Sequence, residues 1–107
     1  MTLEICARDA HARLLDPSAP PCLLDCREAH ELALARVPGA LHIPMAEIPN
    51  RLDDLPRDRD IIVHCHRGSR SLRVAAFLRS RGFERVVSLA GGIDAWSRDV
   101  DPGVPRY

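Results

Sequence analysis

The stretch IIVHCHRGSRSLRVAAFLRSRG, residues 61–82, decides how this chain folds. Residues 61–64 are mostly β-branched and apolar and do not alternate with polar residues, which predicts a strand buried on both faces. Residues 69–81 carry leucine, alanine, valine and phenylalanine at helical spacing, and Gly82 suits the C-terminal cap of that helix. The stretch thus predicts a buried strand, a short loop and a helix in direct succession.

Short apolar runs and helical stripes alternate on both sides of this stretch. The predicted strands are residues 3–5, 22–26, 40–43 and 86–89, and the predicted helices are 7–15, 28–35 and 93–98. A further helical turn or two is expected over 45–52, interrupted at Pro49. Short buried strands that alternate with helices predict an α/β domain with a mainly parallel sheet. The length of 107 residues suits one such domain, which we place over residues 1–107.

Composition narrows the class of protein. Hydrophobic residues make up 46% of the chain and charged residues 28%, with zero net charge, which favours a folded globular protein over a disordered one. No apolar stretch is long enough to span a membrane, and the N-terminus lacks the basic and apolar segments of a signal peptide. We therefore expect a cytoplasmic protein that binds no membrane. Nucleic-acid binding is a poor fit, because the chain has no net charge and no aromatic residues interleaved with basic ones.

All 15 basic residues are arginine, which limits the chemistry available to the chain. There is no lysine for a Schiff base or a phosphate loop, whereas the planar guanidinium suits multi-point binding of anions. Six arginines fall in one stretch whose only acid is Glu84, and they are Arg67, Arg70, Arg73, Arg79, Arg81 and Arg85. The arginines on the predicted helix either dock an acidic partner protein or form a solvated face, and the second interpretation is favoured for Arg79 and Arg81.

Cys65 is the first residue after the buried strand, and this position predicts a reactive thiol. Ligands of parallel α/β sheets bind at the carboxyl ends of the strands. A cysteine at the start of a helix also faces free N–H groups and the positive end of the helix dipole, which stabilise an anion. We therefore predict that Cys65 is a nucleophile, although free cysteines are more often inert buried residues.

The residues that follow Cys65 strengthen this prediction. Gly68 lets the backbone turn so that successive amides point at one centre, serines are good residues for the start of a helix, and the arginines add positive charge and forked donors. The expected anion-binding loop consists of His66, Arg67, Gly68, Ser69, Arg70 and Ser71. A buried structural cysteine would need no such neighbours.

The other cysteines, Cys6, Cys22 and Cys26, predict neither disulfides nor a metal site. Disulfides are not expected in a chain without a secretion signal. Cys22 and Cys26 are not matched by a second pair of cysteine or histidine residues at zinc spacing, so we expect no bound metal.

Four segments resemble those of single-domain rhodanese proteins, a thiosulfate sulfurtransferase-like family. Residues 23–28, LLDCRE, resemble the family's LLDVRE, and residues 37–44, VPGALHIP, resemble its IPGAxxIP. Residues 65–70 fit the Cys-x-x-Gly-x-Arg active loop, and residues 89–96, LAGGIDAW, resemble the closing LxGGxxAW. The segments occur in the right order over almost the whole chain. The resemblance implies a five-stranded, mainly parallel sheet flanked by helices on both faces.

The resemblance also implies sulfur transfer. Cys65 would take sulfur as a persulfide from a small anionic donor such as thiosulfate, or from a donor protein, and pass it to a thiol or protein acceptor. The amides of residues 66–71 would stabilise the persulfide, and Arg67 and Arg70 would bind the donor. No cofactor beyond the covalent persulfide is expected, and nothing demands more than a monomer.

The same resemblance implies a supporting role for Asp25 and Arg27. They would lie at the end of the neighbouring strand and support the loop, or else form a purely structural ion pair. Ala35-Arg36 stand where the family often has Gly-His, which puts in doubt a local contact of that histidine but not the chemistry. Cys26 replaces the usual valine and places a second thiol on the neighbouring strand, near the site. The sequence leaves open whether this thiol takes part in persulfide or disulfide chemistry with Cys65.

Three further side chains receive weaker roles. We expect His64 to be a strand-end residue and His66 to contribute only its amide, because neither has a partner acid in the motif. Trp96 is expected to pack in the core.

The length of the loop after Cys65 distinguishes the chemistries that this family supports. Four residues lie between Cys65 and Arg70, whereas related tyrosine/threonine phosphatases have one more. A phosphatase or arsenate reductase is therefore disfavoured, and a non-catalytic rhodanese-like binding module is disfavoured by the retained cysteine.

Overall fold

Strand β4, Ile61–His64, lies at the centre of a five-stranded sheet in the computed structural model, which describes residues 2–107. The strand order is β1-β5-β4-β2-β3, and every pairing is parallel. The other strands are β1 (Glu4–Ile5), β2 (Cys22–Asp25), β3 (Leu41–His42) and β5 (Val86–Leu89). Residues Ile61–His64 are all buried, as the unalternated apolar run predicts.

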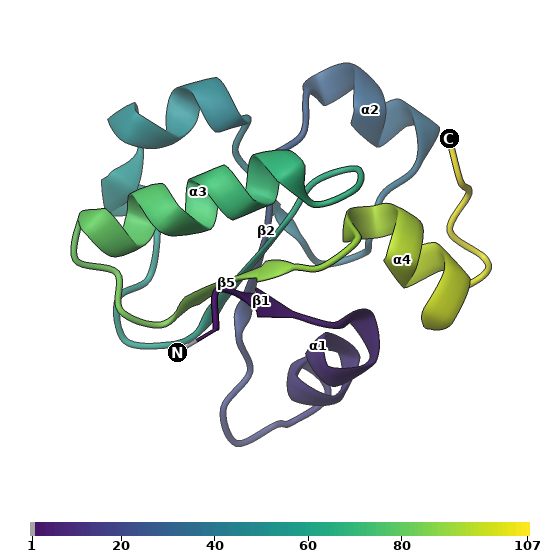
Figure 1. The fold of residues 1–107 in the computed structure, drawn as a ribbon, viewed down its shortest axis with the longest axis horizontal. Coiled ribbons are helices and arrows are strands. Elements are labelled where there is room, and N and C mark those ends of the chain that lie inside the picture. The colour runs from purple at the N-terminus through teal and green to yellow at the C-terminus, as the bar shows by residue number, and fades with distance from the viewer. Residues whose placement is uncertain (1) are drawn as a thin grey trace.

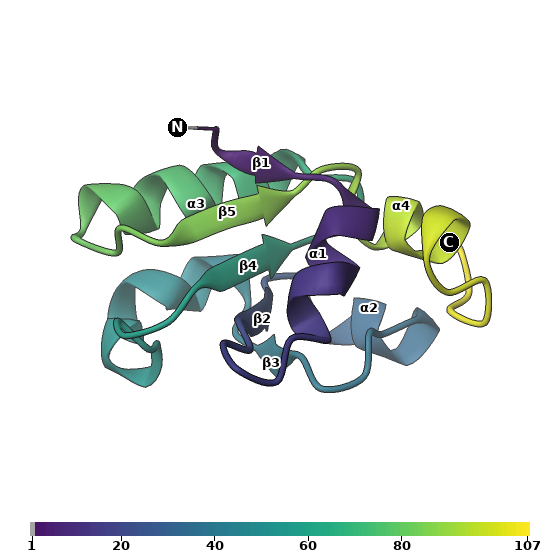
Figure 2. The same cartoon turned by 90° about the horizontal axis from the view of Figure 1, so that it is seen from below.

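Helices cover both faces of this sheet (Figures 1 and 2). The helices are α1 (Ala7–Leu14), α2 (Ala29–Leu34), α3 (Ser69–Ser80) and α4 (Gly92–Asp99), with 3-10 helices η1 (Met45–Asn50) and η2 (Leu52–Asp54). Helix α3 and η1 lie on one face, and α1 packs against α4 on the other. The predicted parallel sheet with helices on both faces is therefore confirmed.

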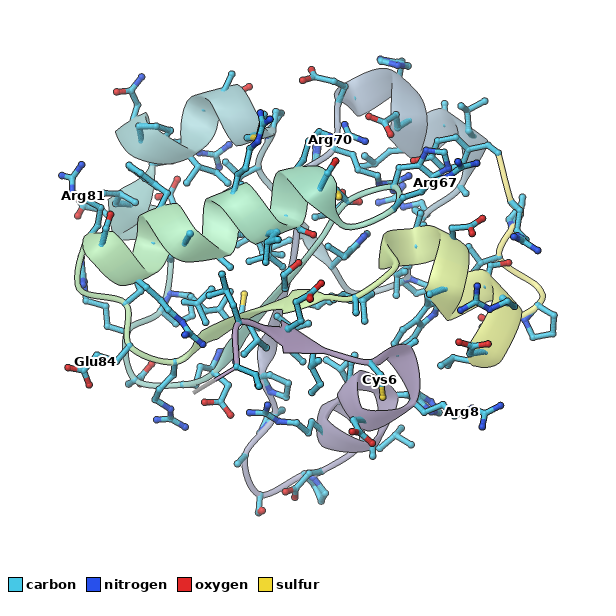
Figure 3. The ribbon with its side chains drawn as sticks, in the orientation of Figure 1. Cys6, Arg8, Arg67, Arg70, Arg81 and Glu84 are labelled. Atoms are coloured by element: carbon cyan, nitrogen blue, oxygen red, sulfur yellow. The ribbon has the colours of Figure 1, made fainter. Side chains whose placement is uncertain are left out.

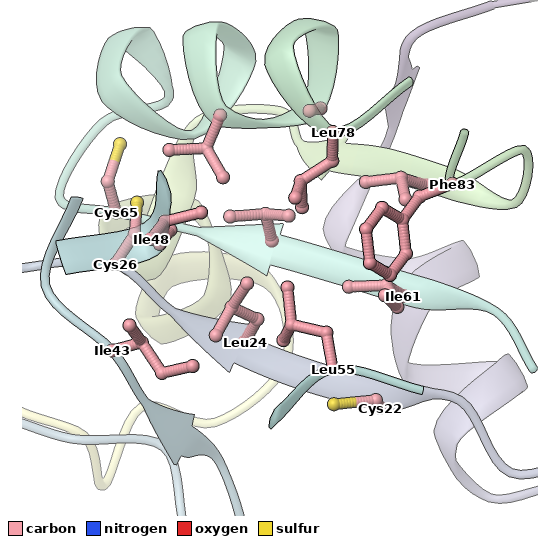
Figure 4. Close-up of a cluster of buried hydrophobic side chains, with 14 residues drawn as sticks. Cys22, Leu24, Cys26, Ile43, Ile48, Leu55, Ile61, Cys65, Leu78 and Phe83 are labelled. Atoms are coloured by element: carbon pink, nitrogen blue, oxygen red, sulfur yellow. The ribbon is translucent and has the colours of Figure 1, made fainter. Parts of the chain in front are cut away.

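Side chains of β4 alternate between two hydrophobic clusters, because successive residues of a strand point to opposite faces. Ile61 and Val63 join the cluster under α3 shown in Figure 4, whereas Ile62 joins the cluster under α1 and α4. All three are at most 1% exposed. Trp96 is buried in the second cluster, which confirms its predicted place in the core.

Two local details differ from the expectations. Residues Met45–Asn50 form a 3-10 helix, and Pro49 inside it has no N–H to give to a longer α-helix. Helix α3 begins at Ser69 as predicted, but its N-cap is Gly68 and no side chain caps it. The hydroxyl of Ser71 instead contacts Cys65, Gly68 and Ser88.

Candidate active site

Cys65 lies between the last residue of β4 and the first turn of α3, at the carboxyl edge of the sheet. The chain must turn sharply there, and Gly68 does so with a φ of +110°. This left-handed conformation is readily accessible only to glycine. A Cβ atom at Gly68 would also lie 3.3 Å from the amide nitrogen of Gly91, so the loop packs directly on the segment before α4.

The N-terminus of α4 holds the carbonyl groups of this loop. The amide of Ile93 donates to the Cys65 carbonyl at 2.9 Å, and the amide of Asp94 donates to the His66 carbonyl at 3.1 Å. A Cβ atom at Gly92 would lie only 2.5 Å from the His66 oxygen, so glycine is required at this contact. The sequence predicts Gly91-Gly92 as a turn, but nothing local in it shows that the turn fits against the cysteine loop.

The sulfur of Cys65 sits inside the loop, and the residue is only 1% exposed. Two backbone amides donate to Sγ, from Gly68 at 3.1 Å and from Ser71 at 3.3 Å. The hydroxyl oxygen of Ser71 lies 3.4 Å from Sγ. Burial alone would raise the pKa of the Cys65 thiol, but the Ser71 hydroxyl and the amides of Ser71, Gly68 and Arg70 outweigh burial and lower it. The loop thus favours the thiolate.

The two loop arginines have different surroundings, although both lie at the loop end of α3 in Figure 3. Arg67 is exposed, and no carboxylate among residues 2–107 forms an ion pair with it. Arg70 instead forms a two-point ion pair with Glu31, at 2.6 Å and 3.0 Å. Of the two expected donor clamps, only Arg67 is free to meet an anion without first leaving a carboxylate.

Glu31 and Tyr107 complete this part of the site, and the sequence prediction included neither. Glu31 is buried and accepts hydrogen bonds from Arg70, from the Tyr107 hydroxyl at 2.7 Å and from the Glu28 amide at 3.1 Å. These interactions, with Arg70 the strongest, lower the pKa of Glu31 to about 2 despite its burial. The Glu28–Glu31 spacing is that of a capping box at a helix start, and it is the one signal in the sequence from which a structural role of Glu31 could be predicted.

Asp25 and Arg27 form a buried ion pair at the end of β2. Arg27 is fully buried, and its guanidinium donates to Asp25 at 2.8 Å and to the Ala35 carbonyl at 2.8 Å. Burial would raise the pKa of Asp25, but the hydrogen bonds from Arg27 lower it. Arg27 also donates to the Tyr107 hydroxyl at 2.9 Å. The pair therefore reaches the loop indirectly, through Tyr107 and through the carbonyl of Glu31, to which Arg27 donates at 3.4 Å.

The two histidines beside Cys65 face away from its sulfur. His64 is fully buried, and its Nε2 lies 3.6 Å from Asp25 without a hydrogen-bond partner. Burial lowers the pKa of His64. The ring of His66 stacks on Tyr107, with centroids 3.9 Å apart, and its Nε2 lies 2.8 Å from the Tyr107 main-chain oxygen. Beyond the amide that the sequence analysis assigns to the loop, the ring of His66 thus contacts the C-terminal segment.

Cys26 lies beside Cys65 at the end of the neighbouring strand, as predicted. Asp25 pairs in register with His64, and the next residue on each strand is a cysteine. Figure 4 shows both sulfur atoms at the same end of the hydrophobic cluster, with Cys22 at the far end. All four cysteines are free thiols. Burial, followed by the nearby charges of Cys65 and Asp25, raises the pKa of Cys26 to about 12, so Cys65 is the more readily ionised of the two.

Comparison with known proteins agrees with this geometry. Residues 7–99 match the rhodanese-like domain. The chain belongs to the rhodanese family. It is 40% identical over 98 residues to a sulfurtransferase of Allochromatium vinosum, covering 92% of this chain and 91% of that one. The resemblance of the four sequence segments to rhodanese proteins is therefore confirmed, and relatives of this family support a role in sulfur transfer.

Solved structures show the same rhodanese fold. A rhodanese-like domain protein from Staphylococcus aureus superimposes with a TM-score of 0.83 at 30% identity, covering 100% of this chain and 99% of that one. A protein from Rhodopseudomonas palustris described as a possible tyrosine phosphatase superimposes with a TM-score of 0.79 at 23% identity, covering 99% and 83%. That likeness shows the fold alone. Several other relatives are longer proteins, of which this chain spans between 22% and 48%.

Two absences concern the part of the chain that the structure describes, residues 2–107. No helix in this range is long and apolar enough to cross a membrane. The described residues also contain no group of three histidine, cysteine or acidic side chains arranged to hold a metal ion.

Proposed function

We propose that this rhodanese-family protein is a sulfurtransferase that carries sulfur as a persulfide on Cys65. The observation that carries the proposal is the position of Sγ, which receives amide hydrogen bonds from Gly68 and Ser71 in a loop that lowers the thiol pKa. A thiolate at this place is a nucleophile without a general base. The same amides are suited to stabilise the negative outer sulfur of a persulfide.

Transfer takes two steps. The Cys65 thiolate attacks the outer sulfur of thiosulfate, a sulfur–sulfur bond forms on Cys65, and the old sulfur–sulfur bond breaks with both electrons leaving on sulfite. A thiophilic acceptor such as cyanide, a small thiol or a protein thiol then takes the outer sulfur and restores the Cys65 thiolate. Arg67 is exposed and forms no ion pair with the described residues, so it is placed to attract the anionic donor. A persulfide on a small molecule or on a protein serves equally as donor.

The setting of this activity belongs to the same proposal. Free thiols at all four cysteines suit a reducing compartment, and we place the protein in the cytoplasm. It acts as a monomer, requires no cofactor beyond the persulfide, and exchanges sulfur with a donor or acceptor protein. The relatives named as sulfurtransferase and sulfur carrier support such a partner.

Mass spectrometry tests the first step. Incubation with thiosulfate should add one sulfur atom to the peptide that contains Cys65, and thiosulfate:cyanide turnover should accompany it. Cys65→Ser should lose both, whereas Cys22→Ser, which alters a buried thiol at the far end of the cluster, should keep both. Full turnover in Cys65→Ser, or an unmodified and inactive wild type, would contradict the proposal.

The same preparation distinguishes the competing chemistry. An aryl phosphate should not be hydrolysed above background, because the loop has the shorter spacing of four residues between Cys65 and Arg70. Phosphatase activity that is lost in Cys65→Ser would replace sulfur transfer with phosphate hydrolysis as the function of this site.

A further inference from the structure

Ser88 is a polar side chain in the middle of an otherwise apolar strand. It follows Val86 and Val87 in β5 and is fully buried. Removing a hydroxyl group from water costs free energy unless the group is hydrogen bonded. The partner of the Ser88 hydroxyl is the hydroxyl of Ser71, at 2.7 Å. Ser88 thus reaches from the sheet to the first turn of α3, directly beneath the cysteine loop.

Ser71 is the link between Ser88 and the reactive sulfur. Its Oγ lies 2.7 Å from the Ser88 hydroxyl, 3.4 Å from Sγ of Cys65 and 3.2 Å from the Gly68 carbonyl. A serine hydroxyl has one proton and two lone pairs. Ser71 can therefore donate a hydrogen bond to the sulfur or to the carbonyl. It can accept a hydrogen bond from Ser88 or from a neutral Cys65 thiol.

We propose that Ser88 is a positioning residue for the sulfur chemistry. Its hydroxyl donates a hydrogen bond to Ser71, so that the hydroxyl of Ser71 in turn donates to the sulfur of Cys65. Within residues 2–107 the only hydrogen-bond partner of the Ser88 hydroxyl is Ser71 Oγ. Once Ser88 fills one lone pair of that oxygen, Ser71 is polarised as a donor, and a thiolate or persulfide anion gains most from it. Without Ser88, the Ser71 oxygen becomes a better acceptor for a protonated thiol.

A pair of variants with the same shape tests this role. Threonine and valine are both β-branched and suit a strand, but only Ser88→Thr keeps the hydroxyl. Iodoacetamide labelling of the Cys65 peptide, followed by mass spectrometry over a range of pH, measures the thiol pKa without any sulfur donor. Ser88→Val should raise that pKa by about half a unit to one unit, which leaves about threefold to tenfold less thiolate below the pKa. Ser88→Thr should stay near the wild-type value.

The control is Ser97→Ala, which removes another buried hydroxyl. Ser97 lies in α4, and its hydroxyl donates to the Val104 carbonyl and not to the cysteine loop. Ser97→Ala should leave the Cys65 pKa unchanged even where it lowers the melting temperature. Ser88→Ala repeats the comparison if the larger side chains unfold the protein. A pKa that is unchanged in Ser88→Val, or that shifts equally in Ser88→Thr or in Ser97→Ala, overturns the proposal.

This inference rests on Cys65 being the reactive sulfur of the proposed function, yet the two can fail separately. An unchanged Cys65 pKa in Ser88→Val together with normal sulfur loading would contradict the role of Ser88 and leave the sulfurtransferase proposal standing. A shifted Cys65 pKa in Ser88→Val, in a protein whose wild type never loads sulfur, would support the hydrogen bond from Ser88 to Ser71 and contradict the sulfurtransferase proposal.

Discussion

Arg67 and Arg70 have the same side chain and lie three positions apart, but their neighbours give them different surroundings. The sequence predicts that both bind the donor. In the structure Arg67 is exposed, while Arg70 is held by a buried carboxylate that also binds the tyrosine at position 107. An arginine whose charge is already compensated attracts a free anion less strongly. If the protein transfers sulfur as proposed, we therefore expect Arg67 and the loop amides to attract the anionic donor more strongly than Arg70 does.

The ion pair of Arg70 and Glu31 predicts a measurable pH dependence of stability. The pKa of Glu31 is lowered from 4.5 to about 2, so the carboxylate stabilises the folded protein above pH 4.5 and this contribution disappears as the pH falls toward 2. Glu31→Gln should lower the free energy of unfolding at pH 7 by about 1–2 kcal/mol. Urea unfolding at several pH values should show the difference from wild type shrinking between pH 4.5 and 2.

Glu84→Gln is the matched control for this prediction, because Glu84 is exposed and forms no ion pair with the described residues. It should change stability by less than about 0.5 kcal/mol at every pH. A Glu31→Gln variant as stable as wild type at pH 7 would show that the ion pair contributes nothing.

The contact of two elements, the start of α4 and the loop before α3, fixes the backbone around the sulfur. The α4 amides bind the loop carbonyls of Cys65 and His66, which leaves the loop amides free to face Sγ. A helix N-terminus commonly serves as an anion site. Here the start of α4 has the different task of orienting a neighbouring loop, and a glycine permits the close approach.

Gly92→Ala should disrupt this contact. Its Cβ would lie 2.5 Å from the His66 carbonyl oxygen and 2.6 Å from that of Cys65, and both are backbone atoms that cannot move alone. We expect a loss of stability greater than about 2 kcal/mol. In the protein that still folds, loading of sulfur from thiosulfate should slow by at least about tenfold, because small displacements of reacting groups are costly. Circular dichroism melts and the loading assay measure the two effects.

Gly39→Ala separates backbone strain from this clash. Gly39 and Gly92 both have a left-handed φ, of +84° and +59°, but a Cβ atom at Gly39 meets nothing within 4 Å. Gly39→Ala should lower the free energy of unfolding by only about 1–2 kcal/mol and leave sulfur loading intact. Equal loading in Gly92→Ala and Gly39→Ala would argue against a role of α4 in shaping the loop.

Across the whole molecule, Tyr107 joins parts of the chain that are far apart in sequence. Its ring stacks on His66 and its hydroxyl lies between Arg27 and Glu31, so β2, α2, the cysteine loop and the C-terminal segment meet at one side chain. The hydroxyl is held by two charged groups, and burial raises the pKa of Tyr107 to about 12. The hydroxyl therefore stays protonated at neutral pH and can donate to Glu31.

Tyr107→Phe tests this junction, because it removes the hydroxyl and keeps the stacked ring. We expect a loss of about 1–2 kcal/mol in the free energy of unfolding, since two charged partners each lose a hydrogen bond. In combination with Glu31→Gln the losses should be less than additive, which a double-mutant cycle from urea unfolding measures. Arg106→Ala, which breaks only an exposed ion pair with Asp94, should cost less than about 1 kcal/mol. Strict additivity would show that Tyr107 and Glu31 act independently.

Local patterns in the sequence determined the parallel α/β fold and the place of Cys65. The apolar run of β4, the helical stripe of α3 and the glycine between them are properties of neighbouring residues, and the physical rules for strands, helices and turns act over such short distances. The position of Cys26 beside Cys65 also followed, because equivalent ends of parallel strands lie at one edge of the sheet. The four rhodanese-like segments, in their order along the chain, then indicated sulfur transfer as the expected chemistry.

Only the tertiary structure decided which partners these residues take. Arg70 pairs with Glu31, 39 positions away, and Tyr107 binds Glu31 across 76 positions. Ser88 meets Ser71 because β5 lies next to β4 beneath α3. Charge and hydrogen-bonding capacity can be read from a residue type, but the choice among many possible partners depends on how the helices pack on the sheet. For the same reason, the sequence predicts that Cys65 is a reactive thiol, whereas the folded loop determines which amides and hydroxyls contact its sulfur.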